Sequence, residues 1–200
     1  MRKYPEGESP RERIIAAART LFGSKGFHAT TTDELTSAAS VSVGLLYRHF
    51  ARKEDIILAI AEENARNGVA EMHGIFDAVE RGELAIAAAI EAIAQNALRE
   101  ADAALFLEIV AESCRNPQVA ERLGQLTNFY RVGVRRLAIL ARPDAARSEL
   151  DACVDLMEAC FIGLSYRAQL VPRLDADAVS RNTARLIMRA LALDEGGTIL

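Results

Sequence analysis

Two short helical patterns, at residues 31–39 and 43–50, are separated by a turn of only three residues. Thr31 and Glu34 have the spacing of a capping box, which marks the start of the first helix. The hydroxyl group of Ser42 is suited to cap the second helix. Because so short a turn makes the two helices cross, this stretch predicts a helix-turn-helix unit.

The segment before this unit predicts a third helix that covers its apolar side. Residues 10–25 carry apolar side chains at helical spacing, with a proline at the start and Lys25-Gly26 as a stop signal. Four apolar residues are expected to lock the two short helices together: Leu35, Ala39, Val41 and Leu46. The second short helix is then held outward, where its N-terminal end can enter a groove of double-stranded DNA.

The rest of the chain continues the helical periodicity. Long helical patterns are expected near residues 52–81, 83–100, 102–115, 118–141, 145–170 and 175–193. No segment shows the convincing apolar-polar alternation of a strand. The sequence therefore predicts an all-α fold of about nine helices, with an N-terminal arm and three-helix DNA-binding domain at residues 1–52 and a larger helical domain at residues 53–200.

Charge is unevenly distributed along the chain. The net charge of −4 at pH 7 argues against a wholly basic nucleic-acid binder. Residues 1–55 nevertheless carry a net charge of +2 and all three lysines, whereas residues 56–200 carry −6. The N-terminal quarter is therefore the part of the chain that DNA phosphates repel least.

Cysteine usage and hydropathy bear on the compartment. The cysteines are Cys114, Cys153 and Cys160, an odd number without CxxC spacing, which predicts reduced thiols in a cytoplasmic protein. No apolar run reaches about 18 residues, so no membrane-spanning helix and no membrane partner are expected. The N-terminus also lacks the apolar core of a signal peptide.

Two other classes of function compete with DNA binding. A metalloenzyme is disfavoured because His28, His49 and His73 lie far apart and no HxxxH or CxxC spacing occurs. Glycine-rich nucleotide loops and a GxSxG elbow are missing as well, so no metal, no cofactor and no catalysis are expected, although folding could bring a histidine to a cysteine. A helical interaction module that has lost DNA binding is the second alternative.

The segment from Arg11 to about Asn64 resembles the N-terminal domain of the TetR family of transcriptional regulators. The resemblance rests on these motifs: Ile14-Ile15-x-x-Ala18 with Leu21-Phe22, Lys25-Gly26-Phe27, Ala29-Thr30-Thr31, Val41-Ser42, Leu46-Tyr47-x-His49-Phe50 and Lys53-Glu54. Two positions depart from the family pattern, with Ser40 where the turn often has glycine and Thr36 where alanine is common. A serine in the left-handed conformation costs roughly 1 kcal/mol, so the turn is expected to differ slightly. The rest of the chain matches the family in layout alone.

The resemblance implies which side chains touch DNA. Phosphate contacts are expected from Thr31, Tyr47, His49 and Lys53. Thr31 can offer a hydroxyl group and a free backbone N–H at a helix N-terminus, and Lys53 places an ammonium group at the start of the next helix. The alternatives are a plain N-cap for Thr31, packing of Tyr47 on the first helix, and solvated surface positions for His49 and Lys53.

Base reading is expected from the first turns of the second short helix. The candidates are Ser42, Val43, Gly44 and Leu45, with Arg48 at the edge. Gly44 allows the helix backbone to come close to the bases. Because the set contains no asparagine or glutamine, we expect apolar contacts with thymine methyl groups and reading of DNA shape more than bidentate hydrogen bonds.

The larger domain is expected to dimerise and to bind an effector. Dimer contacts are expected from Leu150, Val154 and Leu164 on one helix and from Val179, Leu186, Ile187 and Leu191 on the next. The effector pocket is expected to be lined by Phe106, Ile109, Val110, Leu126, Phe129, Tyr130, Met157 and Phe161. One of Glu108, Glu112, Cys114 or His73 could add a polar anchor, although the glutamates are expected to face water. Ordinary core packing is the alternative for both sets.

Together these expectations describe a homodimeric, sequence-specific transcriptional regulator. The resemblance implies a repressor that leaves a palindromic DNA operator when a small, partly apolar effector binds. The helix at residues 52–81 links the two domains, so a ligand that favours one placement of this helix changes the spacing of the two recognition helices. Activation is left open as well, since the effect depends on where the operator lies.

Overall fold

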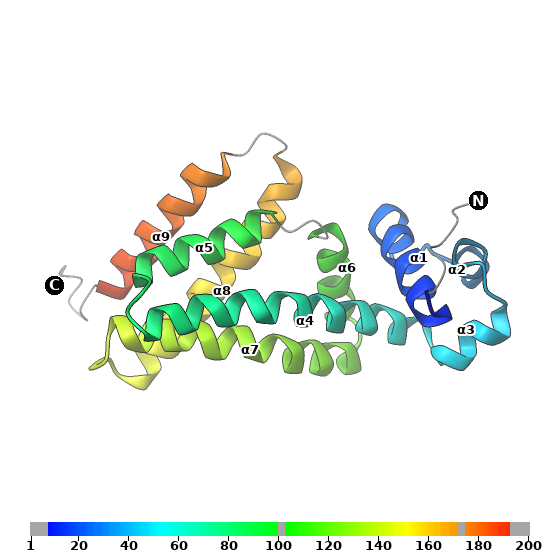
Figure 1. Cartoon of the computed structure of the whole chain (residues 1–200), viewed down its shortest axis with the longest axis horizontal. Helices are drawn as coiled ribbons and strands as arrows, with labels where there is room; N and C mark the ends of the chain where they lie inside the picture. The colour runs from blue at the N-terminus through cyan, green and yellow to red at the C-terminus, as the bar shows by residue number, and fades with distance from the viewer. Residues whose placement is uncertain (1–7, 100–102, 172–174, 193–200) are drawn as a thin grey trace. The chain divides into compact units, whose positions relative to one another are not determined.

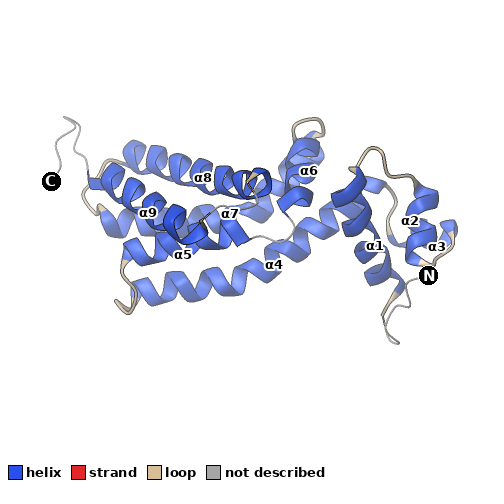
Figure 2. Cartoon of the chain, turned by 90° about the horizontal axis from the view of Figure 1, so that it is seen from above, coloured by secondary structure: helices blue, strands red, loops and turns tan. Residues whose placement is uncertain are grey.

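The computed structural model describes residues 8–99, 103–171 and 175–192, and within these ranges the chain forms nine α-helices and no strand (Figure 1; Figure 2). The helices are α1 (Pro10–Lys25), α2 (Thr32–Ala39), α3 (Val43–His49), α4 (Lys53–Glu80), α5 (Ile86–Arg99), α6 (Ala103–Ser113), α7 (Pro117–Ala141), α8 (Arg147–Leu170) and α9 (Ala176–Ala192). Each predicted helix is present, with ends within three residues of the predicted ones. The all-α fold is therefore confirmed.

The described helices form two compact units, each with its own hydrophobic core. We call residues 1–66 and 104–126 the head unit, and residues 67–103 and 127–200 the body unit. Both α4 and α7 contribute residues to each unit. This division differs from the boundary predicted after residue 52, because the first part of α4 and most of α6 pack into the core that α1, α2 and α3 build.

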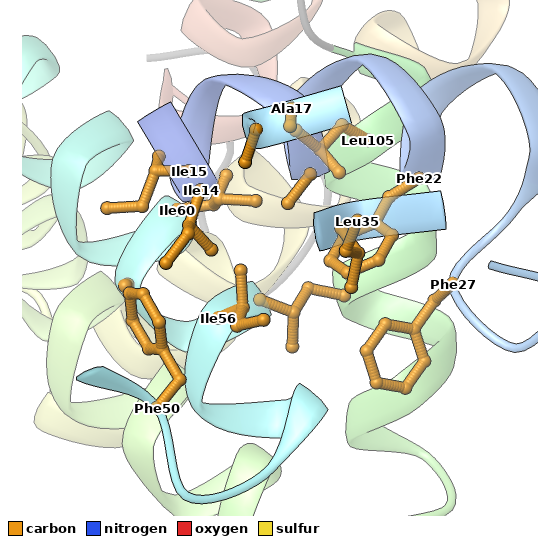
Figure 3. Packing of buried hydrophobic residues seen from close by; sticks show 14 of the residues in the cluster. Ile14, Ile15, Ala17, Phe22, Phe27, Leu35, Phe50, Ile56, Ile60 and Leu105 are labelled. Carbon is orange, nitrogen blue, oxygen red and sulfur yellow. The ribbon is translucent and has the colours of Figure 1, made fainter. Parts of the chain in front are cut away.

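The core of the head unit joins the three N-terminal helices to α4 and α6 (Figure 3). Ile14, Phe22, Leu35 and Ile56 are each at most 1% exposed in this core. Leu46 is the residue of α3 that enters it, at 3% exposure. Because burial of apolar surface is the main favourable contribution to folding, Leu46 fixes α3 against its neighbours, while most of the other residues of α3 stay exposed.

The core of the body unit is built around α5, which packs against α8 and α9, with parts of α4 and α7 added. Ile90, Leu137 and Met157 are each at most 1% exposed. Gly133 makes room for an aromatic ring, because a Cβ atom at this position would overlap the ring of Phe76. Among the residues that the structure describes, none of the helices has the length and apolar character that crossing a bilayer requires.

Four residues predicted at a dimer interface belong to the core of the body unit. They are Leu150, Val154, Ile187 and Leu191, each at most 7% exposed. Leu164 and Val179 are half-buried, and Leu186 is 61% exposed. The prediction is wrong for the four buried residues, because an apolar stripe in a sequence does not reveal which of two apolar helix faces packs inside the chain.

Candidate nucleic-acid interface

Helix α3 is short and presents most of its residues to solvent. Its N-cap Ser42 accepts a hydrogen bond from the backbone N–H of Leu45 at 3.2 Å, and Leu46 is buried. Leu45 is half-buried. The other residues predicted to touch DNA from this helix and its cap are exposed: Ser42, Val43, Gly44, Tyr47, Arg48 and His49. Helix α3 therefore forms an outer face of the head unit.

The exposed face of α3 makes no polar contact with the other residues that the structure describes. A Cβ atom added at Gly44 would meet no atom within 4 Å. Within the described part of the chain, the side chains of Tyr47, Arg48 and His49 make no hydrogen bond or ion pair, and Tyr47 is 51% exposed. A phenol, a guanidinium group and an imidazole that are free in this way can bond to phosphate oxygens or to base edges.

The turn between α2 and α3 is fixed by contacts within the head unit. Ser40 has φ 53° and ψ 47°, so the predicted left-handed residue is present. The guanidinium group of Arg13 donates to the C=O of Ser40 at 3.2 Å, and Val41 N–H donates to the C=O of Thr36 at 3.0 Å. The buried hydroxyl of Thr36 donates to the C=O of Asp33 at 3.1 Å. Both departures from the family pattern are therefore accommodated.

Thr31 caps α2 through reciprocal bonds with Glu34. Its hydroxyl oxygen accepts from Glu34 N–H at 3.2 Å, and its own N–H donates to the Glu34 carboxylate at 2.9 Å. The Lys25 ammonium group bonds to the same carboxylate, and this bond, followed by those from Thr31, lowers the pKa of Glu34 to about 2. The expected free N–H at Thr31 is therefore wrong, because Glu34 occupies it. In the described structure the N–H groups of Thr32 and Asp33 are without a partner.

Lys53 holds the α1–α2 loop, which comprises residues 26–31. Its Nζ atom donates to the C=O groups of Phe27 at 2.8 Å, Thr30 at 3.0 Å and His28 at 3.4 Å. The ammonium group also lies 4.6 Å from the centroid of the Phe27 ring. Each N–H group of Lys53 thus has an acceptor inside the chain. The phosphate contact of Lys53 stays a prediction, and the structure adds a second role for this side chain.

Two glutamates of α6 bind the same loop. Glu108 accepts from the backbone N–H of Phe27 at 2.9 Å. The Oε2 atom of Glu112 lies 2.9 Å from Nε2 of His28 and 3.4 Å from the guanidinium group of Arg115, and the Glu112 side chain is 5% exposed. The expectation that both glutamates face water is therefore wrong. Sequence reasoning missed these contacts because Phe27 and Glu108 lie 81 residues apart in the chain.

The residues predicted to line one effector pocket divide between the two units. Phe106, Ile109, Val110 and Leu126 belong to the head unit, and Phe129, Tyr130, Met157 and Phe161 belong to the body unit. Ile109 and Met157 are each 1% exposed, in separate cores. In the body unit the His73 ring stacks on Phe129 with ring centroids 4.4 Å apart, and Phe76 and Tyr130 meet Phe129 edge to face. We call these four residues the aromatic group.

A hollow of about 420 Å³ lies on the body unit along α7 and the start of α8. It is lined by Asn128, Arg131, Val132, Arg135, Arg147 and Asp151. Asp155 and Glu158 each bond to Arg131 at 2.7 Å and raise the pKa of its guanidinium group. Carboxylates therefore balance much of the positive charge at this hollow. The described residues contain no group of three or more side chains that could hold a metal ion.

Comparison with known sequences places the helix-turn-helix unit in a family. The profile of the family described as "Bacterial regulatory proteins, tetR family" matches residues 14–60. The HTH-type transcriptional regulator UidR of Escherichia coli K12 is 34% identical over 122 residues, which are 59% of this chain and 59% of UidR. The match with this relative thus spans less than two thirds of its length.

Solved structures extend the likeness to nearly the whole chain. GusR of Salmonella enterica is 28% identical with a TM-score of 0.68, covering 94% of this chain and 100% of GusR. The transcriptional regulator FadR from Bacillus subtilis, in complex with stearoyl-CoA, has a TM-score of 0.72 at 15% identity, covering 88% of this chain and 96% of FadR. The FadR likeness shows the fold alone. Residues 14–60 therefore carry the helix-turn-helix segment of the TetR family of bacterial regulatory proteins, and the sequence and fold of the chain are similar to those of UidR and GusR.

Proposed function

We propose that the chain is a sequence-specific transcriptional regulator that places α3 in the major groove of DNA. The observation that carries this proposal is the outer face of α3, where the open position Gly44 accompanies Tyr47, Arg48 and His49, none of them bonded within the described structure. A recognition helix needs such a face, because side chains that are already bonded inside the protein cannot reach base edges or phosphates.

The phosphate contacts would lie on either side of α3. Tyr47 and His49 offer an O–H and an imidazole N–H from α3 itself. At the start of α2 the N–H groups of Thr32 and Asp33 can bind a phosphate beside the Thr31 cap. Base reading would fall to Ser42, Val43, Gly44, Leu45 and Arg48.

We infer that two copies of the chain associate through α8 and α9. Residues spaced alternately by four and three positions form a row along each helix: Ala152, Leu156, Ala159, Gly163, Tyr166 and Leu170 on the side of α8 away from its buried residues, and Val179, Thr183, Leu186 and Ala190 on α9, beside its buried residues. Leu156, Tyr166, Leu170 and Leu186 are 47–61% exposed. Because this spacing is that of a coiled-coil seam, the occupant that fits is the same pair of helices from a second copy.

A two-fold dimer of this kind favours a palindromic operator. Each copy would present one α3, and the symmetry axis of the protein would coincide with that of the DNA site. We propose that the dimer represses transcription while it occupies this site.

A small, partly apolar effector would bind the body unit at the aromatic group. His73 adds a polar ring to Phe76, Phe129 and Tyr130, and ligand sites combine apolar walls with a few polar groups in this way. FadR, which shares the fold, holds stearoyl-CoA. Effector binding would release the operator, for which a coupling free energy of about 1–3 kcal/mol is sufficient.

Selection from a pool of random-sequence DNA duplexes tests the proposal. The wild-type chain is expected to enrich a palindrome and to bind it with nanomolar, salt-sensitive affinity in fluorescence anisotropy titrations. Arg48→Ala should weaken binding by about tenfold. Arg66→Ala, which removes the same charge from an exposed position on α4, serves as the control. If the wild-type chain enriches no sequence, DNA recognition by α3 is excluded.

A further inference from the structure

The α1–α2 loop has few backbone bonds of its own. Gly26, with φ +92°, donates its N–H to the C=O of Phe22 at 2.9 Å, and the hydroxyl of Thr30 donates to the C=O of Gly26 at 2.8 Å. Backbone groups of a partly buried loop need partners, because an unpaired buried N–H or C=O is costly. Other elements must therefore satisfy the middle of this loop.

Helices α4 and α6 supply these partners from two sides. Lys53 of α4 donates to three C=O groups of the loop, as described above. Glu108 of α6 accepts the N–H of Phe27 at 2.9 Å, and its carboxylate lies 3.7 Å from the Cβ position of Gly26. A cation therefore binds the acceptors of the loop, and an anion binds a donor.

Glu112 adds a contact with a side chain of the loop. It lies one helical turn after Glu108, so both carboxylates are on the same face of α6. At 5% exposure its carboxylate has lost most of its hydration, and the partners that compensate are His28 at 2.9 Å and Arg115 at 3.4 Å. Removing the charge of Glu112 should therefore release His28.

We propose that Glu108 and Glu112 are positioning residues for DNA binding, which fix the α1–α2 loop and through it the Thr31 cap at the start of α2. The proposal rests on the proposed function, since it concerns the same DNA-binding face. Thr31 follows directly after Thr30, the last loop residue that Lys53 holds. A loop released from α6 leaves the start of α2, and with it the packing of α3, less well defined.

The direction in which DNA affinity changes distinguishes a positioning role of Glu108 from simple repulsion between its carboxylate and DNA. Removing a carboxylate from a DNA-binding protein normally tightens binding, because DNA is an anion. Glu108→Ala is expected to weaken binding of the selected duplex about tenfold, because it removes a charge-assisted hydrogen bond. Glu108→Gln keeps an acceptor oxygen and should restore most of the affinity. Glu112→Gln should weaken binding by a smaller factor. Glu121→Ala, at an exposed position of α7 in the same unit, is the charge-matched control and should leave binding unchanged or tighter.

Hydrogen–deuterium exchange of the full-length chain measures the loop contact without DNA. Glu108→Ala should speed exchange in a peptide that covers residues 26–31, and Glu121→Ala should not.

Unchanged exchange in Glu108→Ala overturns the contact between Glu108 and the loop. Faster exchange together with wild-type duplex affinity overturns the positioning role. A wild-type chain that selects no duplex overturns the proposed function instead, and the exchange result still decides whether α6 holds the loop. If Glu108→Ala does not fold, Glu108→Gln provides both measurements, with a smaller expected change.

Discussion

The head unit and the body unit each expose a helix face that the described residues leave uncovered, but the chemistry of the two faces is opposite. On α3 the face carries Gly44, a phenol, a guanidinium group and an imidazole. On α8 it carries Leu156 and Tyr166 in a stripe with small residues. The first face suits a polar, anionic partner whose surface must be approached closely, and the second suits another apolar helix.

The two faces also differ in how the protein holds them. Helix α3 has seven residues and one buried side chain, so its orientation depends on its neighbours, among them Arg13 at the preceding turn. Helix α8 has 24 residues and is fixed by a row of its own side chains, such as Val154 and Met157. The face that would read DNA is therefore sensitive to distant contacts, whereas the apolar face is sensitive mainly to changes within it.

The largest expected effect comes from placing a charge on the apolar face. Leu156→Glu would bury a carboxylate in the seam between two copies, where it has no compensating partner. We expect a monomer in sedimentation velocity, and operator affinity should fall about 100-fold because the two α3 helices no longer bind together. Ala87→Glu, at an exposed position of α5, introduces the same charge elsewhere in the body unit and should leave the dimer intact. A dimeric Leu156→Glu variant would show that the subunits associate elsewhere.

The next largest effect concerns Gly44, where stability and binding should change in opposite directions. Alanine has the higher helix propensity and meets no atom at this position, so Gly44→Ala should raise the free energy of unfolding by up to about 1 kcal/mol. The added methyl group should weaken operator binding about tenfold if the backbone lies against the bases. Gly74→Ala, also without neighbours within 4 Å, should stabilise the chain without this loss. Equal operator affinity of Gly44→Ala and wild type would place α3 away from the bases.

Tyr47→Phe should have a smaller effect that is the same for every DNA sequence. The phenol hydroxyl makes no bond within the described chain, so its removal should leave the melting temperature unchanged. Loss of one phosphate hydrogen bond should weaken binding about fivefold, both to the selected duplex and to a scrambled one. Anisotropy titrations of the two duplexes measure this ratio. A lower melting temperature would instead show that the hydroxyl group of Tyr47 is bonded within the protein.

Local features of this chain are the ones that the sequence predicted correctly. The caps at Thr31 and Ser42 and the left-handed turn at Ser40 depend on a few consecutive residues, and each is present in the structure. Helix ends also follow from local signals, such as the glycine after α1. Caps and turns depend on residues within one or two helical turns of each other, and this is the distance over which the periodic pattern of a sequence predicts structure.

Features that depend on long-range packing were predicted less well. Leu156 and Met157 are adjacent, yet Leu156 is 48% exposed and Met157 is 1% exposed. Both sides of α8 are apolar, so the periodicity of the sequence does not show which side is buried inside the chain. The bonds of Lys53 and Glu108 with the α1–α2 loop join segments far apart in the chain. One signal was available: two glutamates a turn apart on a helix that is otherwise mostly apolar indicate paired carboxylates more strongly than solvated ones.

The smallest expected effect concerns the carboxylate of Glu34 at the start of α2. The bond from Lys25, with those from Thr31, lowers the pKa of Glu34 from 4.5 to about 2. A carboxylate with a depressed pKa stabilises the folded state above its unfolded pKa, and this contribution is lost as the pH falls through the folded value. Wild type should therefore melt at a higher temperature than Glu34→Gln at pH 5 and above, and the difference should shrink between pH 4.5 and about pH 2.

Glu121→Gln, at an exposed site without such partners, provides the reference in calorimetric scans across this range. If the difference between wild type and Glu34→Gln does not shrink more than the difference for the reference variant, the negative charge of Glu34 contributes nothing to the stability of the cap.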